Sequence, residues 1–337
     1  MNKNMEHEKQ EVVENSNKTV SFATPIAIVV AALILSGAWI YGKREAASAI
    51  GAVSNQNIPG NQHEAVVAAD DEVTPSKGVV LSATWGNLGK QLVDVGAIDR
   101  DKFEQLYKSR GQLTNEYKDL LVGDKNGKIK ITKENAGYYL NLFWALGLSS
   151  KNTILEKGPM MDPRFGGAQN FASTGGWTVA VGNPMDHYSK HTYFALTAAQ
   201  ENLVFKVAQG VYRPCCGNST IFPDCNHGMA MLGLLELMAS QGASEQEMWR
   251  AALTVNSYWF PDTYNTIATY MKNKGVEWKD VNPQEVLGAN YSSAQGFAKI
   301  AAQVTDLHQH QSSGGCGVDA GQPAVVPQPK QQPGCGV

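Results

Sequence analysis

The sequence predicts a mainly α-helical protein, with an N-terminal transmembrane helix, a tether and then an irregular helical bundle that includes a small β-hairpin. Three observations predict this class. Residues 22–41 carry no charge, helix-capping patterns and helically spaced apolar residues recur across residues 197–304, and strand-like character is confined to two short segments near residues 79 and 128.

The first element is the run from Phe22 to Tyr41, FATPIAIVVAALILSGAWIY, whose twenty residues match a hydrocarbon core of about 30 Å when helical. A polar leader, residues 1–21, precedes it and mixes glutamates with lysines. A cleaved signal peptide is the alternative, but the apolar run is longer than its usual core and the leader is not simply basic. We therefore expect an uncleaved single-pass anchor in the cell membrane, with the soluble domain extracytoplasmic.

Residues 42–77 are rich in Ala, Ser, Asn, Gln and Gly and have few large apolar side chains. Such a composition buries too little surface to offset the entropy lost on ordering, so it predicts a flexible tether. The folded part is expected to begin near Gly78, with residues 78–196 forming a mixed helical and irregular subdomain. Its first strand is expected at Val79–Thr84, followed by a helix that ends at Gly96.

Asp99 is the expected N-cap of the next helix, which repeats Phe103, Leu106 and Tyr107 on one face. Further on, Asn126-Gly127 before the alternating sequence KIKI predicts a hairpin turn.

The strand should run into a helix capped by Thr132. After it, residues 149–197 are rich in Gly and Pro and predict a long irregular segment. Within that segment His187 and His191 are either a metal-ligand pair or, as we favour, two partly buried polar rings.

Residues 197–304 predict a helical bundle. Thr197 is the expected cap of its first helix and Asp224 of its second, while Ser244 and Glu247 form a capping box for the third. A fourth helix should start at Pro261. Short connections between these helices predict mostly antiparallel neighbours.

Composition narrows the classes of function. The chain has 28 Lys and Arg against 31 Asp and Glu, a net charge of −3, which offers no electrostatic basis for binding nucleic acid. Five cysteines in 337 residues are too few for a disulfide scaffold, and the odd number leaves at least one sulfur unpaired within a monomer. A localised sulfur site is therefore expected.

That site is predicted in the connection between the first two bundle helices. Cys215, Cys216 and Cys225 lie within eleven residues and His227 follows directly. The start of a helix favours a thiolate, and a Gly- and Pro-containing loop can fold back on it. Cys215, Cys216, Cys225 and His227 are therefore candidate ligands of a transition metal, Zn by the preference for Cys and His, or Cu if Met229 and Met231 add thioether sulfur.

Two alternatives stay open. In an oxidising compartment Cys225 could form one structural disulfide with Cys215 or Cys216, and the protein would then be a structural surface protein. A bond between the adjacent Cys215 and Cys216 would be strained. In the other alternative, Cys216 and Cys225 are the catalytic pair of a thiol–disulfide oxidoreductase that acts on other cysteine-containing extracytoplasmic proteins.

The second alternative has support from a local resemblance. The sequence TAAQENLVFKVAQGVYRPCCGNS, and later QGASEQEMWRAALTVNSYW, covers roughly residues 197–260. It resembles the membrane-anchored thiol oxidoreductases of cytochrome c maturation, three-helix bundles with an Arg-Cys-x-x-Cys motif. Arg213 and Asn218 lie near the motif positions, but Pro-Cys-Cys replaces the spaced pair. The resemblance implies that Cys216 matches one family cysteine and that Cys225 supplies the second.

The C-terminal residues 305–337 are rich in Gly, Gln and Pro and carry Gly-Cys-Gly-Val twice, around Cys316 and Cys335. This composition predicts a disordered tail. Its thiols either pair, with each other or between chains, or deliver metal or reducing equivalents to the loop site.

Overall fold

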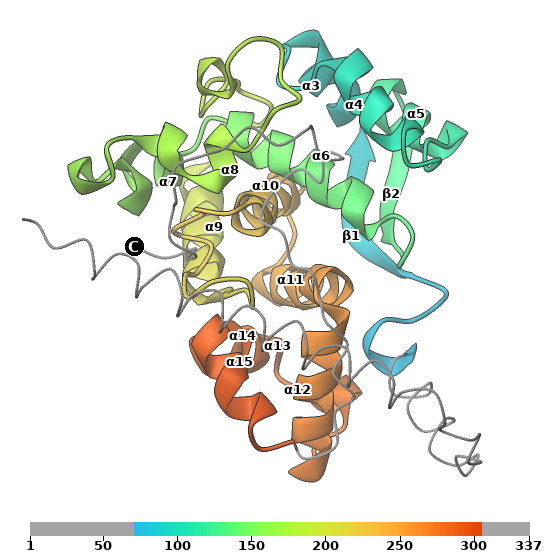
Figure 1. Cartoon of the computed structure of the whole chain (residues 1–337), viewed down its shortest axis with the longest axis vertical. Coiled ribbons are helices and arrows are strands. Elements are labelled where there is room, and N and C mark those ends of the chain that lie inside the picture. The colour runs from blue at the N-terminus through green and yellow to red at the C-terminus, as the bar shows by residue number, and fades with distance from the viewer. Residues whose placement is uncertain (1–70, 305–337) are drawn as a thin grey trace, which may run out of the picture. The chain divides into compact units, whose positions relative to one another are not determined.

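The computed structural model describes residues 71–304 (Figure 1). The predicted leader, transmembrane helix and Cys-containing tail, and most of the tether, lie outside the described residues. Within residues 71–304, no helix combines the length and apolar character that crossing a bilayer requires. This part of the chain is mainly helical, as predicted, and contains one two-stranded antiparallel sheet.

The N-terminal elements form the sheet and the helices above it in Figure 1. They are β1 (Val79–Gly86), α3 (Leu88–Asp94), α4 (Arg100–Lys108), α5 (Asn115–Val122) and β2 (Asn126–Ile131). The strands are antiparallel, with Val79 opposite Ile131 and Gly86 opposite Asn126, and with an irregularity between Val80 and Thr84.

The predicted hairpin is wrong, because α3, α4 and α5 separate the two strands. Asn126 begins β2 rather than a turn. Its side-chain amide donates to the carbonyl oxygens of Gly86 and Asp119, both at 2.9 Å, so contacts from distant parts of the chain determine its conformation.

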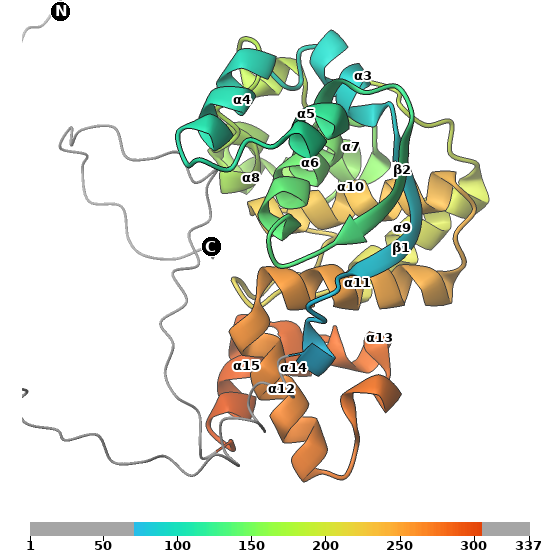
Figure 2. The same ribbon diagram turned by 90° about the vertical axis from the view of Figure 1, so that its right-hand side faces the viewer.

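The centre of the fold is the pair α6 (Ala136–Ser149) and α10 (Asn226–Ser240), which lie side by side (Figures 1 and 2). Two glycines allow this approach. A Cβ on Gly147 would lie 2.0 Å from the carbonyl oxygen of Met229, and one on Gly233 would lie 2.5 Å from that of Phe143. Because the backbones touch here, residues 226–239 of α10 are buried from end to end.

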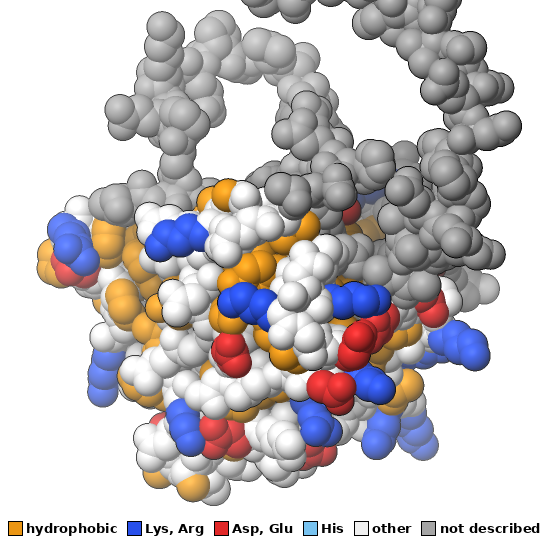
Figure 3. All heavy atoms as spheres, turned by 90° about the horizontal axis from the view of Figure 1, so that it is seen from below, with side chains coloured by type: hydrophobic (Ala, Val, Ile, Leu, Met, Phe, Trp, Pro, Cys, Tyr) orange, Lys and Arg blue, Asp and Glu red, His pale blue; other side chains and the backbone are white. Residues whose placement is uncertain are grey.

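The remaining long helices are α9 (Ala198–Gly210), α11 (Glu245–Trp259) and α12 (Pro261–Asn273), followed by the short α13 (Pro283–Val286), α14 (Ala289–Ser292) and α15 (Ala294–Ala301), with a 3-10 turn at Trp278–Asp280. Figure 1 shows α9 and α11 beside α10, and α12 to α15 below α11. Charged side chains of both signs are intermingled on the face formed by this lower end (Figure 3).

Helix starts fixed by local side chains are confirmed. Thr197 and Ser244 each accept a hydrogen bond from the backbone N–H three residues on, at 3.3 Å, and both form full capping boxes. Asp99 caps α4 and Pro261 begins α12. Thr132 instead caps a turn that precedes α6, accepting from the N–H of Asn135.

The segment between α6 and α9 contains only short helical turns, in agreement with its Gly and Pro content. These are α7 (Thr153–Lys157), α8 (Ala172–Gly175) and 3-10 turns at Pro159–Met161, Pro163–Phe165, Ala168–Asn170 and Pro184–Asp186. His187 Nδ1 and His191 Nε2 lie 3.1 Å apart, and His187 Nε2 lies 2.8 Å from the carbonyl oxygen of Val181. Both nitrogens of the buried His187 therefore have partners within the fold.

Packing begins earlier than the expected boundary at Gly78. The predicted tether extends to residue 77, yet Val73 and Thr74 are buried. The hydroxyl of Tyr258 also donates to the carbonyl oxygen of Pro75 at 2.6 Å. The end of this segment is therefore part of the packed domain.

Candidate metal centre

The loop between α9 and α10 carries the site and is held back against its own helices. Tyr212 and Ser219 form an antiparallel bridge, and the backbone N–H of Thr220 donates to Val211 O at 2.9 Å. The N–H of Tyr212 donates to Leu287 O, also at 2.9 Å, which ties the loop to the end of α13. These bonds fold Cys215 and Cys216 toward the start of α10.

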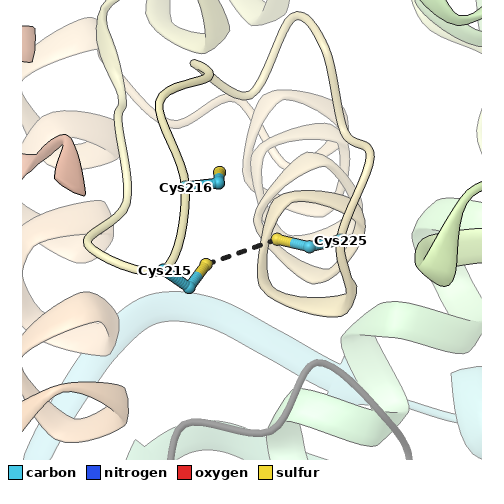
Figure 4. Close-up of side chains that lie close together, drawn as sticks. All are labelled: Cys215, Cys216 and Cys225. Atoms are coloured by element: carbon cyan, nitrogen blue, oxygen red, sulfur yellow. Dashed lines mark hydrogen bonds between the residues drawn. The ribbon is translucent and has the colours of Figure 1, made fainter. Parts of the chain in front are cut away.

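Three sulfur atoms meet there. The Sγ atoms of Cys215, Cys216 and Cys225 all lie within 4.8 Å of one another, and those of Cys215 and Cys225 face each other at 3.5 Å (Figure 4). Cys216 and Cys225 are buried, with exposed fractions of 2% and 1%, whereas Cys215 is partly exposed. None of the three is in a disulfide, so none of the pairings considered from the sequence is present among them.

A buried cation, the guanidinium of Arg213, lies beside the sulfurs and hydrogen-bonds to one of them. The guanidinium of Arg213, 1% exposed, donates from Nε to Cys225 Sγ at 3.1 Å. It also donates to the carbonyl oxygens of Asn218 and Phe222, at 3.1 and 2.8 Å, and forms an ion pair with Asp224. A fully hydrogen-bonded buried Arg keeps its charge, so a positive charge lies permanently beside Cys225.

Asp224 is not the N-cap of α10, which corrects the sequence interpretation. Its carboxylate accepts from Arg213 and, at 2.8 Å, from the side-chain amide of Asn218. Cys225 occupies the N-cap position, with its sulfur at the positive end of the helix. A charge-assisted bond to a buried guanidinium is stronger than an ordinary cap, which explains the exchange.

Gly228, in the first turn of α10, makes room for this cation. A Cβ at Gly228 would lie 2.5 Å from Arg213 Cζ. The guanidinium can therefore lie directly against the first turn of α10 only because residue 228 has no side chain.

The electrostatics distinguish the thiols of Cys216 and Cys225. Hydrogen bonding from Cys215 and Cys216, and then the charge of Arg213, hold the pKa of Cys225 well below its usual value despite burial. At Cys216, hydrogen bonding to Cys215 lowers the pKa, but hydrogen bonding to Cys225 and burial outweigh it and raise the pKa to about 12. Of these two buried thiols, Cys225 is therefore the more acidic.

His227 lies beside the cluster but outside the group of ligand atoms that are all within 4.8 Å of one another. Its interaction with Cys225 contributes to the lowered pKa of that thiol. The ring packs against Phe260, with centroids 4.4 Å apart, and its Nδ1 is buried with no hydrogen-bond partner among the described residues. The three cysteines are thus assembled, and His227, predicted as a fourth ligand, is not part of the group.

The arrangement fits a thiophilic metal ion. With Zn–S bonds of about 2.3 Å, two sulfurs of a tetrahedral site lie about 3.8 Å apart, close to the 3.5 Å between Cys215 and Cys225. The cluster could therefore hold a metal with small side-chain adjustments. Met229 and Met231, considered as thioether ligands, are both buried members of the apolar core.

No family model matches this chain, and searches of curated proteins and of solved structures also find no match. Function must therefore be inferred from the site itself.

Sequence reasoning identified the sulfurs but missed the burial of Arg213. Arg213 was noted only as a motif neighbour, and its burial follows from tertiary packing. Glu236 is the single charge in MAMLGLLELMA, and that isolation was the signal available for a buried carboxyl. The structure places Glu236 on α10 with an exposed fraction of 1%.

Proposed function

We propose that the protein binds a thiophilic transition metal ion, Zn²⁺ or Cu⁺, through the thiolates of Cys215, Cys216 and Cys225. The observation that carries the proposal is the convergence of three cysteine sulfurs within 4.8 Å, none of them in a disulfide. Soft sulfur ligands select these ions over Mg²⁺ or Ca²⁺. We further propose that the N-terminal apolar run anchors the chain in a membrane, so that metal is handled on the extracytoplasmic side.

Charge and burial both support metal binding. Three thiolates brought together without a cation would repel one another, and a bound metal ion with Arg213 would neutralise most of that charge. The hydrogen bond that Arg213 Nε donates to Cys225 Sγ at 3.1 Å is of the kind that orients metal ligands from outside the coordination shell. Burial also protects the sulfurs of Cys216 and Cys225 from oxidation.

The number of assembled ligands bears on which ion is bound. Three thiolates complete a trigonal Cu⁺ site, whereas tetrahedral Zn²⁺ needs a fourth ligand. The fourth ligand would be His227, after a small shift of its ring, or a water molecule reached past the partly exposed Cys215. A position open to exchange is typical of sites that pass metal on or perform chemistry on it.

The test is anaerobic titration of the reduced full-length chain with Zn²⁺ and with Cu⁺. One ion should bind per chain, and Cys215→Ser, Cys216→Ser and Cys225→Ser should each weaken binding at least tenfold. The double variant Cys316→Ser/Cys335→Ser is the matched control, because it removes more thiols than any of the single variants and leaves the cluster unchanged. If that control abolishes binding and Cys225→Ser does not, the proposal is wrong.

A second function, thiol–disulfide exchange, has one specific observation in its favour, the 3.5 Å approach of Cys215 Sγ to the low-pKa Cys225. The predicted catalytic pair, Cys216 and Cys225, is buried, so the partly exposed Cys215 is the sulfur a partner can reach. The Cys215 thiolate would attack the partner's disulfide and release one partner thiolate. Cys225 would then attack the mixed disulfide at Cys215, leaving a Cys215–Cys225 disulfide and a fully reduced partner.

This second function makes a distinct prediction. Cys225→Ser should accumulate mixed disulfides through Cys215 in cells, whereas Cys215→Ser should not. Equal amounts of mixed disulfide in both variants would exclude this pair as the exchange site.

A further inference from the structure

A second site lies on α10, at the end of the helix opposite the cysteines. A cavity of about 110 Å³ is lined by residues before and within α7, by α9 and by Glu236 of α10. The Glu236 side chain is buried, and its Oε1 accepts a hydrogen bond from the amide of Asn152. Its Oε2 has no hydrogen-bond partner among the described residues.

A buried carboxyl oxygen without a partner is costly, so a group that supplies a hydrogen bond or a positive charge at this position would be stabilising. Ile154, Leu196, Val204 and Phe205 form the apolar part of its wall. The other charged residues that line the cavity are the exposed Glu201 on α9 and the exposed Lys151. These two exposed charges are of opposite sign, so the buried carboxyl of Glu236 is the group that favours a cationic ligand.

The cavity adjoins a second, larger hollow with exposed apolar side chains on its wall. A neighbouring hollow of about 680 Å³ shares Thr153, Ile154 and Phe205 with the cavity. Its wall includes Met161, which is 46% exposed, and Phe205 is 47% exposed. A short aliphatic chain lying there would cover exposed apolar surface beside the carboxyl.

We propose that this cavity binds the ammonium group of an aliphatic primary amine, with Glu236 as its counter-ion and the alkyl chain along Ile154 and Phe205. The cavity is somewhat smaller than one that holds benzene, and it therefore accommodates an ammonium group with a few methylenes. Asn152 is the positioning residue. Its Oδ1 accepts from the backbone N–H of Ile154 at 2.6 Å while its amide holds the Glu236 carboxyl.

Protonation of Glu236 gives the proposal a characteristic signature. Burial, only partly offset by Asn152 and Ser150 and assisted slightly by the charge of Glu201, raises the pKa of this carboxyl to about 8. Below that pH the free protein carries a neutral carboxyl, and binding an ammonium releases its proton to solvent. Affinity should therefore rise about tenfold per pH unit up to about pH 8 and then level off.

The experiment is calorimetric titration of the purified full-length chain with n-butylammonium, and with 1-butanol as the neutral ligand of equal size. The amine should bind at least tenfold more tightly than the alcohol at pH 8, and release close to one proton at pH 6.5. Each added methylene should tighten binding about twofold to fourfold. Equal binding of amine and alcohol, or affinity independent of pH, would overturn the proposal.

Variants separate the carboxyl from the cavity. Glu236→Gln should weaken amine binding at least tenfold and abolish proton release, while Glu156→Gln, an exposed α7 carboxyl that does not line the cavity, should leave both unchanged. Asn202→Trp should block the cavity without altering Glu236. Binding that survives both Glu236→Gln and Asn202→Trp contradicts the assignment, and Cys225→Ser should not affect it because the sulfur site is separate.

Discussion

Glu236→Gln should stabilise the protein increasingly as pH rises. The pKa of Glu236 is raised by burial from an ordinary value of 4.5 to about 8. Because the pKa of this carboxyl is raised on folding, the contribution of Glu236 to stability is fully present below the unfolded pKa. It is lost as the pH rises through the folded pKa. Each pH unit between the unfolded and the folded pKa lowers the free energy of unfolding by about 1.4 kcal/mol, or by about 4 kcal/mol between pH 5 and pH 8.

Gln keeps the oxygen that accepts from Asn152 and cannot ionise, so it removes this pH dependence. The assay is urea unfolding of wild type and Glu236→Gln from pH 5 to pH 8.5, which cancels every other titrating group in the difference. Glu156→Gln, at an exposed carboxyl, is the matched control and should give a flat difference. A Glu236→Gln difference that stays flat, or falls with pH, would refute the burial of an uncompensated carboxyl.

Three further predictions concern the packing and the sulfur site. Arg213→Gln leaves Asp224 buried without its cation and should cost about 3–5 kcal/mol in the free energy of unfolding; a loss below 1 kcal/mol would show that the ion pair is not buried. Gly147→Ala should destabilise by about 2–3 kcal/mol because its Cβ meets the α10 backbone, whereas Gly137→Ala, with nothing within 4 Å, should stabilise by about 0.5–1 kcal/mol; similar values in thermal melts for both would contradict the close approach. In the reduced, metal-free chain, the depressed pKa of Cys225 contributes stability that is present above the unfolded thiol pKa of about 8.5 and lost on acidification through the folded value, so the advantage of wild type over Cys225→Ala should shrink as pH falls.

Local chemistry predicted the elements whose ends are fixed by their own residues. Thr197, Ser244 and Asp99 cap the helices expected of them because the acceptor and donor lie three residues apart. The proximity of Cys215 to Cys225 was equally local, since a short loop closes onto one helix start. These features need no knowledge of the rest of the fold.

Features set by distant contacts were not predictable in this way. Asn126-Gly127 has the composition of a hairpin turn, but pairing with β1 across α3 to α5 determines its conformation. Asp224 has the composition of an N-cap, yet the guanidinium of Arg213 binds it instead. Burial of Arg213 depends on how its loop packs against the first turn of α10, which no pattern in the sequence around it reveals.

The most direct test of the sulfur site is X-ray absorption at the metal edge of the full-length chain loaded with one equivalent of Zn²⁺ or Cu⁺. The cysteine cluster predicts a first shell with three sulfurs at about 2.3 Å, one fewer in Cys225→Ser. A shell of nitrogen and oxygen alone, or a sulfur shell unchanged in Cys225→Ser, would contradict it.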